Sequence, residues 1–256
     1  MPTAAINGYQ HHWEESGSGQ PLVLIHGAAG SGKMLEKFVP ALSQHFRVIV
    51  PDMRGLGQSE RVSAAEQPVD AWVQDLRGLQ DHLGLGPLNV YGLTVGGRVA
   101  MRLAVESPER VRSLIVDMPV MFNEQSAQAG VRKDVVVEQL SDARRKQLQS
   151  LHGDEWESAT RFYEEFRARA DWMEYFDLRE DSKKISARVL IMRGDAPGDA
   201  YSAEHAFMLY RNVPGAWLWI RPNTVGALLR NDPEVAQALI RDFVLSDGEA
   251  ATGSTY

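Results

Sequence analysis

The chain of 256 residues contains no cysteine. It can therefore form no disulfide, and it offers neither a thiol nucleophile nor a thiolate ligand for a metal. Its sequence contains no apolar run that approaches the roughly 18 residues needed to span a bilayer. The amino-terminal segment lacks the basic and apolar regions of a signal peptide. The formal net charge of −7 disfavours nucleic acid or an anionic membrane surface as the main partner. These absences predict a cytoplasmic protein that acts on a small molecule, without a nucleic-acid or membrane partner.

Hydrophobic residues make up 44% of the chain, which is enough for one full core and a lid. Strand-like and helix-like segments alternate up to residue 117, beginning with a strand expected at 9–15 and a helix expected at 33–45. The alternation stops over a charged, helix-rich stretch and resumes at residue 188. That stretch is too long for a structureless loop. The pattern predicts an α/β core at 1–119 and 186–245, a helical cap at 120–185 and a flexible tail at 246–256.

The stretch Gly92-Leu93-Thr94-Val95-Gly96 follows an apolar strand and precedes an amphipathic helix. It resembles the nucleophile elbow of α/β-hydrolases, in which small residues surround a strained central residue at the edge of the sheet. Other landmarks of that family follow the expected order, namely His26-Gly27, the loop 51–59 and the helix that opens at Pro233. From Gly8 to about Leu245, the chain resembles a capped, single-domain α/β-hydrolase. The resemblance implies a mostly parallel sheet flanked by helices, with the site above the carboxyl ends of the strands.

The same resemblance implies a catalytic triad of serine, acid and histidine, and the counted positions hold Thr94, Pro197 and Gly226 instead. A hydroxyl group is a weak nucleophile without an adjacent base. The extra methyl group of threonine also stiffens the side chain and crowds the approach of a substrate. Three roles for Thr94 stay open at this point: a small polar residue that lines the pocket, a hydrogen-bonding group that orients the substrate, and a nucleophile with an unrecognised base.

Backbone groups do not depend on side-chain identity, so the resemblance also implies an intact oxyanion hole formed by the N–H groups of Ala28 and Val95. The loops at the altered triad positions carry polar residues that could replace the lost acid–base chemistry. The expected catalytic residues are Thr94, Asp195, Asp199 and Asn223, and the expected substrate-binding residues are Ala29, Met118, Trp172, Tyr175 and Gly226.

A competing motif lies in the segment 27–34, which nearly matches the phosphate loop Gly-x₄-Gly-Lys-[Ser/Thr] and follows a buried strand. Met34 occupies the position of the magnesium-binding hydroxyl, however, and a thioether is not a ligand for magnesium. The preferred interpretation is therefore a glycine-rich oxyanion loop. No cofactor and no metal are expected.

The missing base and acid predict a non-hydrolytic enzyme that binds a bulky apolar small molecule, such as a natural-product intermediate, under the cap. Such an enzyme would use the oxyanion hole to promote cyclisation, C–C bond formation, elimination or rearrangement. Two alternatives stay open: a non-catalytic binding protein for a small molecule, and a slow esterase with Thr94 as its nucleophile.

Overall fold

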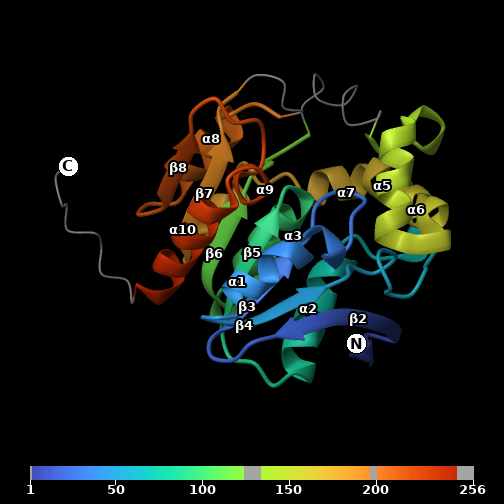
Figure 1. Ribbon diagram of the computed structural model, residues 1–256, viewed down its shortest axis with the longest axis horizontal. Helices are drawn as coiled ribbons and strands as arrows, with labels where there is room; N and C mark the ends of the chain where they lie inside the picture. Colours follow the sequence, from blue (N-terminus) through green and yellow to red (C-terminus); the bar gives the residue numbers. More distant parts are fainter. Residues whose placement is uncertain (1, 124–133, 197–200, 247–256) are drawn as a thin grey trace.

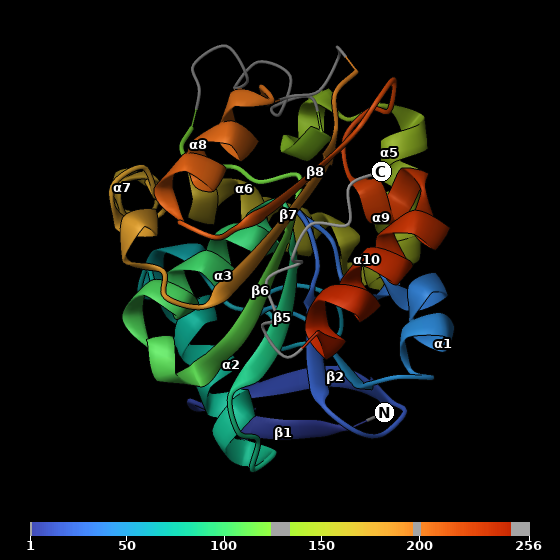
Figure 2. The same ribbon diagram turned by 90° about the vertical axis from the view of Figure 1, so that its left-hand side faces the viewer.

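The computed structural model describes residues 2–123, 134–196 and 201–246. Within these residues, eight strands form one sheet in the order β1-β2-β4-β3-β5-β6-β7-β8, with helices on both faces (Figures 1 and 2). The strands β1 and β2 pair antiparallel with their neighbours, and all other pairs are parallel. This architecture confirms the predicted α/β-hydrolase fold class. In the described part of the chain, no helix combines the length and the apolar character that a membrane span requires.

The strands are β1 (Thr3–Ile6), β2 (Tyr9–Ser16), β3 (Pro21–Ile25), β4 (Arg47–Pro51), β5 (Leu88–Leu93), β6 (Val111–Asp117), β7 (Arg188–Gly194) and β8 (Trp217–Arg221). All six residues of β5 are buried, because this strand lies in the middle of the sheet between two helical layers. Its carboxyl end therefore opens onto the centre of the molecule, where the site forms.

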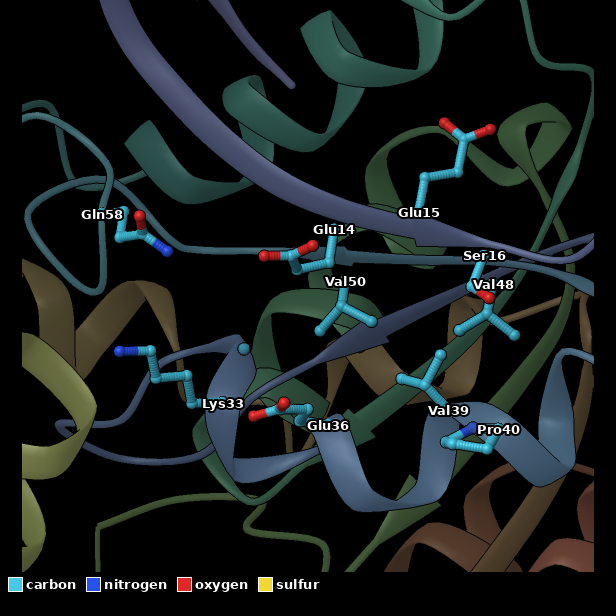
Figure 3. A pocket seen from close by; sticks show the side chains of 11 residues that line it. Glu14, Glu15, Ser16, Lys33, Glu36, Val39, Pro40, Val48, Val50 and Gln58 are labelled. Carbon is cyan, nitrogen blue, oxygen red and sulfur yellow. The ribbon is translucent and has the colours of Figure 1, made fainter. Parts of the chain in front are cut away.

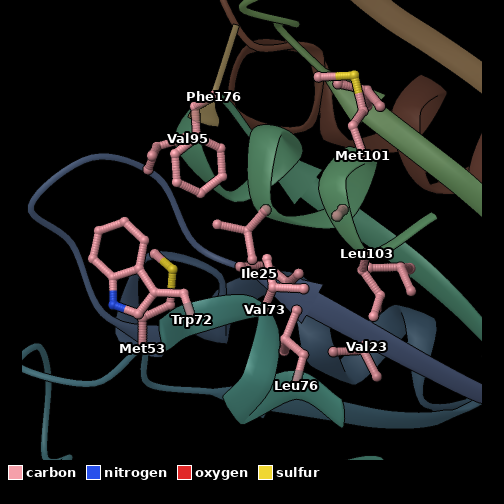
Figure 4. Close-up of a cluster of buried hydrophobic side chains, with 14 of the residues drawn as sticks. Val23, Ile25, Met53, Trp72, Val73, Leu76, Val95, Met101, Leu103 and Phe176 are labelled. Atoms are coloured by element: carbon pink, nitrogen blue, oxygen red, sulfur yellow. The ribbon is translucent and has the colours of Figure 1, made fainter. Parts of the chain in front are cut away.

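The helices that flank the sheet are α1 (Val39–Leu42), α2 (Ala71–His82), α3 (Val95–Glu106), α8 (Glu204–Asn212), α9 (Leu228–Asn231) and α10 (Pro233–Leu245). Side chains alternate along the strands, so Val23 and Ile25 belong to the core cluster with α2 and α3, while Leu22 and Leu24 belong to the one with α1 and α10. Figure 4 shows part of the first cluster, in which Val73 and Leu76 of α2 pack near Val23 and Ile25.

Between β6 and β7 lie the helices α5 (Asp142–His152), α6 (Trp156–Ala168) and α7 (Ala170–Tyr175), at the right of Figure 1. Phe166 of α6 packs edge-on against Trp72 of α2, with ring centroids 4.9 Å apart, and Tyr163 stacks on the same indole. These aromatic rings belong to the same hydrophobic cluster as the α2–α3 face of the sheet. The inserted helices are thus packed onto the core through a continuous apolar contact.

Candidate active site

Thr94 stands alone between the end of β5 and the first residue of α3, with φ +49° and ψ −105°. Its N–H donates to the carbonyl oxygen of Asp117 over 3.1 Å, and its own carbonyl accepts from the N–H of Arg98. A β-branched residue at positive φ is strained, typically by about 1–3 kcal/mol. A Cβ atom added to Gly92 would lie 2.5 Å from the carbonyl oxygen of Gly96, so glycine is needed for this tight turn. The backbone here has the geometry expected of a nucleophile elbow.

Ala28 and Val95, whose backbone N–H groups are the expected oxyanion hole, line the same cavity as Thr94. Val95 is the first residue of α3, so its N–H has no partner within the helix. Neither group has a hydrogen-bond acceptor among the described residues. The loop after β3 runs directly against the threonine, because a Cβ atom on Gly27 would lie 3.0 Å from Thr94 Oγ1. Two free donors beside a hydroxyl group can stabilise a negative charge that develops on a carbonyl oxygen.

A cavity of about 170 Å³ opens over Thr94 beneath the inserted helices. Five residues expected in the site line it, namely Ala28, Thr94, Val95, Met118 and Trp172. The sequence did not predict the other polar residues that line the cavity, which are Arg98, Asn123, Asp134, Tyr163, Arg167 and Tyr201. Most of these come from 120–185 or follow β7, and no local motif signals that they meet above β5.

Positive φ angles gather around this cavity. Besides Thr94, the non-glycine residues Ala29 (φ +46°) in the oxyanion loop and Met118 (φ +58°) after β6 adopt this conformation. The other two non-glycine examples in the described part of the chain are asparagines, which tolerate it well. Strained backbone that collects at one place is characteristic of a functional site.

The remaining residues expected in the site lie elsewhere. Asp195 and Asn223 are exposed, outside the cavity lining, and the N–H of Asn223 donates to Asp195 Oδ1 over 2.6 Å. The Tyr175 hydroxyl donates to Glu106 Oε1, and Gly226 is buried with its carbonyl accepting from the N–H of Gly194. Ala29 is buried next to Ala28 in the chain and does not itself line the cavity. Asp199, like Pro197, lies outside the described residues. Of the described residues in this second group, none lines the cavity over Thr94.

No histidine lines the cavity, although all seven lie in the described ranges. His26 Nε2 accepts from the N–H of Met53 over 3.1 Å, so its Nδ1–H donates to the carbonyl of Gly27. Complete burial lowers the pKa of His26. An imidazole that is neutral and bonded at both nitrogens holds the oxyanion loop in place but cannot take a proton from Thr94.

His152, at the end of α5, ties the inserted helices to the same loop. Its Nδ1 accepts from the N–H of Gly57 over 3.0 Å, and its Nε2–H donates to the carbonyl of Ala29 over 3.0 Å. Burial lowers the pKa of His152 to about 4, so the ring is neutral at neutral pH. The Ser31 hydroxyl donates to the carbonyl of Leu151 beside it. The oxyanion loop is thus clamped by α5.

Asp117 ends β6 next to Thr94, but its carboxylate is fully engaged. It accepts hydrogen bonds from the N–H groups of Leu228 and Leu229, at 2.7 and 2.8 Å, and from the Tyr91 hydroxyl at 2.9 Å. Burial raises the pKa of Asp117 to about 6 in spite of these donors. This carboxylate fastens the first turn of α9 to the sheet.

A larger cavity of about 460 Å³ lies on another side of the molecule, between β2, β4 and the turn η1 (Gly32–Met34) (Figure 3). Lys33 lines it together with the carboxylates of Glu14, Glu15 and Glu36. The N–H of Gly32 donates to Asp52 Oδ1 over 2.6 Å, so a carboxylate already occupies the place of an anion. A phosphate group would meet several negative charges here, which supports the interpretation of 27–34 as an oxyanion loop.

Residues 20–187 match the α/β-hydrolase fold family, and this range is more than half of the chain. The chain belongs to that family. It is 41% identical over 116 residues to the soluble epoxide hydrolase of Corynebacterium sp. strain C12, covering 45% of this chain and 40% of the relative. It is 37% identical over 112 residues to the 2-hydroxymuconate semialdehyde hydrolase of Pseudomonas sp. strain CF600, covering 43% and 40%. The matched segment thus spans about two fifths of the length of each of these curated relatives.

Solved structures of the family share the fold over nearly the whole chain. The meta-cleavage product hydrolase of Pseudomonas fluorescens IP01 superposes with a TM-score of 0.74 at 22% identity, covering 95% of this chain and 97% of that one. The enol-lactonase of Burkholderia xenovorans LB400 superposes with a TM-score of 0.72 at 21% identity, covering 95% and 99%. These likenesses establish the fold.

The curated relatives correct the functional expectation. They are hydrolases of epoxides and of semialdehydes, so the expectation of a non-hydrolytic enzyme for cyclisation, C–C bond formation, elimination or rearrangement is wrong. That expectation was based on counting residues along the chain to the triad positions and finding Thr94, Pro197 and Gly226 there. Such counting takes no account of polar groups that a separate segment brings over the elbow, such as Asp134.

Proposed function

We propose that this family member is a hydrolase of a small carbonyl-containing substrate, with Thr94 as the nucleophile and the N–H groups of Ala28 and Val95 as the oxyanion hole. The observation that carries the proposal is the strained position of Thr94 between these two free donors. The relatedness to hydrolases over the segment that contains the elbow supports it.

The reaction begins with the substrate carbonyl carbon over Thr94 Oγ1 and the carbonyl oxygen between the two N–H groups. Attack by the hydroxyl group forms a tetrahedral intermediate, and each donor to its oxyanion is worth about 10²–10³ in rate. Collapse of the intermediate releases the leaving group and leaves an acyl-threonine. Water then attacks the acyl group, which gives the carboxylic acid and restores the threonine.

The proton of Thr94 needs an acceptor, and Asp134 is the one carboxylate among the described residues that line the cavity. Its side chain has no hydrogen-bond donor within the described ranges, and it is exposed to solvent. We assign it the role of general base, acting through a water molecule. A carboxylate is a weaker base than a histidine, so this enzyme is expected to be slow on unactivated esters and faster on substrates with a good leaving group.

The size of the cavity limits the substrate. An apolar cavity of about 150 Å³ holds a benzene molecule, and the space over Thr94 measures about 170 Å³. Its walls include Met118, Val120 and two tyrosines. An acyl group of about the size of one ring fits this site.

The test uses p-nitrophenyl acetate and p-nitrophenyl benzoate with the wild type, Thr94→Ala and Asp134→Asn. We expect kcat to fall about 10²-fold in Asp134→Asn, and at least as far in Thr94→Ala, because the nucleophile itself is gone. Thr94→Ser should retain activity, since it keeps the hydroxyl group and removes the crowding methyl. Mass spectrometry of the quenched wild type should find the acyl group on Thr94.

Matched controls are Thr224→Ala, on the loop after β8, and Asp154→Asn, between α5 and α6, because both residues lie outside the cavity. Both controls should keep the wild-type rate. A folded Thr94→Ala variant with undiminished hydrolysis would refute the proposal, as would a wild type that binds such esters without turning them over.

A further inference from the structure

Arg98 is a buried cation that forms no close ion pair with a carboxylate of the described residues. It lies on α3 one turn after Thr94, is 2% exposed and lines the cavity. Its Nε donates to the carbonyl of Val120 and its Nη1 to Asn123 Oδ1, both over 2.9 Å. Its Nη2 has no acceptor among the described residues, and no carboxylate there forms an ion pair with it. Burial lowers the pKa of Arg98 to about 10, so the guanidinium group remains charged at neutral pH.

Trp172 supplies a second unused donor beside it. The guanidinium carbon of Arg98 lies 5.5 Å from the centre of the Trp172 ring, and the buried indole Nε1–H has no acceptor within the described ranges. A buried polar group that lacks a partner is costly, and a buried charge is more so. A buried group of this kind calls for an explanation, and a catalytic role or a bound ion is one of those that native proteins offer.

A second positive group, Arg167 of α6, lines the same cavity, where its guanidinium carbon lies 6.0 Å from the centre of the Tyr163 ring. Two carboxylates oppose these charges. Asp134 is exposed to solvent, which screens it, and Asp177, which attracts Arg98 from beyond ion-pair distance, is itself paired with Arg179. The cavity is therefore electropositive at its buried end.

We propose that Arg98 and Trp172 form an anion-binding subsite, so that the substrate of this enzyme carries a carboxylate in addition to the carbonyl group that is attacked. This inference rests on the proposed hydrolase function for its meaning, but the subsite itself can be tested by binding alone. A carboxylate suits these donors because its two oxygens can accept from Nη2 of Arg98 and from Nε1 of Trp172. Placed one helical turn from Thr94, the anion would fix which carbonyl of the substrate lies over the hydroxyl.

Binding is measured by isothermal titration calorimetry at neutral pH with benzoate and with benzamide, which has the same ring but no charge. We expect the wild type to bind benzoate at least 10-fold more tightly than benzamide. Arg98→Met should abolish this preference, and Trp172→Phe, which keeps the ring and removes only the N–H, should weaken benzoate binding about 3- to 10-fold. Arg161→Met on α6 removes an arginine whose side chain is 43% exposed, and it should bind both probes as the wild type does.

Because Arg98 is buried, Arg98→Met is first checked for folding by circular dichroism. Arg98→Lys is the second variant: it keeps the charge but loses the planar pair of donors, so the benzoate preference should fall at least 3-fold while benzamide binding stays the same. Equal affinity of the wild type for both probes overturns the subsite. So does a benzoate preference that survives intact in a folded Arg98 variant.

Turnover separates the two proposals. The substrates are the mono-p-nitrophenyl ester of glutaric acid, which carries a free carboxylate, and its methyl-capped neutral form. A higher kcat/KM for the anionic ester, lost in Arg98→Lys, supports the subsite as part of the active site. Hydrolysis of both esters at equal rates keeps the hydrolase and overturns the subsite. Arg98-dependent binding of benzoate without hydrolysis of either ester keeps the subsite and overturns the hydrolase.

Discussion

At the scale of single residues, Asp117 decides how the loop after β8 meets the sheet. Its carboxylate binds two successive N–H groups at the start of α9, a helix of only four residues that could not hold its first turn by itself. The tyrosine hydroxyl below it completes the set of donors. This side chain sits where a catalytic acid could be imagined, yet its hydrogen bonds show a structural role.

Asp117→Asn should therefore destabilise the protein. An amide offers one acceptor oxygen in place of two, so one buried N–H of α9 loses its partner, at a cost of about 1–3 kcal/mol at pH 7.5. The pKa of Asp117 is raised to about 6 in the folded state. The folded protein then binds this proton more readily than the unfolded chain, and the wild type gains stability as the pH falls below 6. The difference in the free energy of unfolding between wild type and variant should be about 1 kcal/mol larger at pH 5 than at pH 7.5.

Urea unfolding at the two pH values measures both quantities, with the unpaired surface variant Glu165→Gln as a control for a lost charge. If the difference in the free energy of unfolding became smaller toward pH 5, the raised pKa of Asp117 would be contradicted.

Residues of the site divided sharply into those that the sequence could predict and those that it could not. Thr94, Ala28 and Val95 lie in short segments that match the elbow and the oxyanion loop of α/β-hydrolases, so the resemblance to that family predicted that they meet. Arg98 occupies an ordinary helical position, and nothing in its neighbours signals that Trp172 will cover it. Its character arises from burial, which depends on the inserted helices.

At the scale of elements, α5 reaches down to the oxyanion loop through its last residues. His152 links the N–H of Gly57 to the carbonyl of Ala29, and Leu151 accepts from Ser31. The imidazole can make both of its bonds only in the neutral form, because protonated Nδ1 could no longer accept from Gly57. This connection makes the attachment of α5 sensitive to acid.

The sign of that sensitivity follows from the lowered pKa. Between pH 6.5 and about 4, the unfolded chain carries a proton on this histidine that the folded protein does not, so stability falls as the pH falls through this range. From pH 7.5 to pH 5, His152 should account for a loss of about 2 kcal/mol. His152→Gln should be less stable at pH 7.5 but should lose less on acidification. Urea unfolding at both pH values measures this difference.

His45→Gln serves as the control, since this histidine does not bridge two segments. If His152→Gln lost as much stability on acidification as the wild type, the role of neutral His152 as a link between Gly57 and Ala29 would be refuted.

The elements themselves were largely predictable because strands buried on both faces consist of short apolar runs, as in β3 and β5. Two errors have physical causes. The helix expected at 33–45 is instead η1, a second 3₁₀ turn η2 (Glu36–Phe38) and the four-residue α1, because Pro40 has no N–H to continue a helix that began before it. The strand β1 was missed since its alanines carry little strand signal; the turn Asn7-Gly8, with both φ values positive, was the available clue.

At the scale of the whole molecule, one hydrophobic cluster contains residues of the sheet and residues of the expected cap at 120–185. One cluster runs from the sheet through Trp72 of α2 into Phe166 of α6 and Phe176 after α7. A second cluster, on the opposite face, contains none of these inserted residues. The inserted helices therefore share their hydrophobic stabilisation with the sheet.

Such sharing predicts a single cooperative unfolding transition. Phe166→Ala should lower the free energy of unfolding by about 3–5 kcal/mol, because it opens a cavity in the shared cluster. The transitions followed by tryptophan fluorescence and by far-ultraviolet circular dichroism should coincide in both proteins. Phe243→Ala, in the second cluster, is the comparison and should show the same coincidence. Two separate transitions in the wild type would show instead that the inserted helices unfold as an independent unit.

The insertion between β6 and β7 also has a consequence during synthesis. These strands pair in parallel, yet residues 118–187 separate them along the chain. A ribosome adds about 5–20 residues per second, so on the order of ten seconds pass between the synthesis of β6 and that of β7, its neighbour in the sheet. An unpaired strand edge can form hydrogen bonds with a strand of another chain, which leads to aggregation. The nascent protein is thus most exposed to aggregation while its inserted helices are being translated, and chaperones that hold unfinished chains would matter most in that interval.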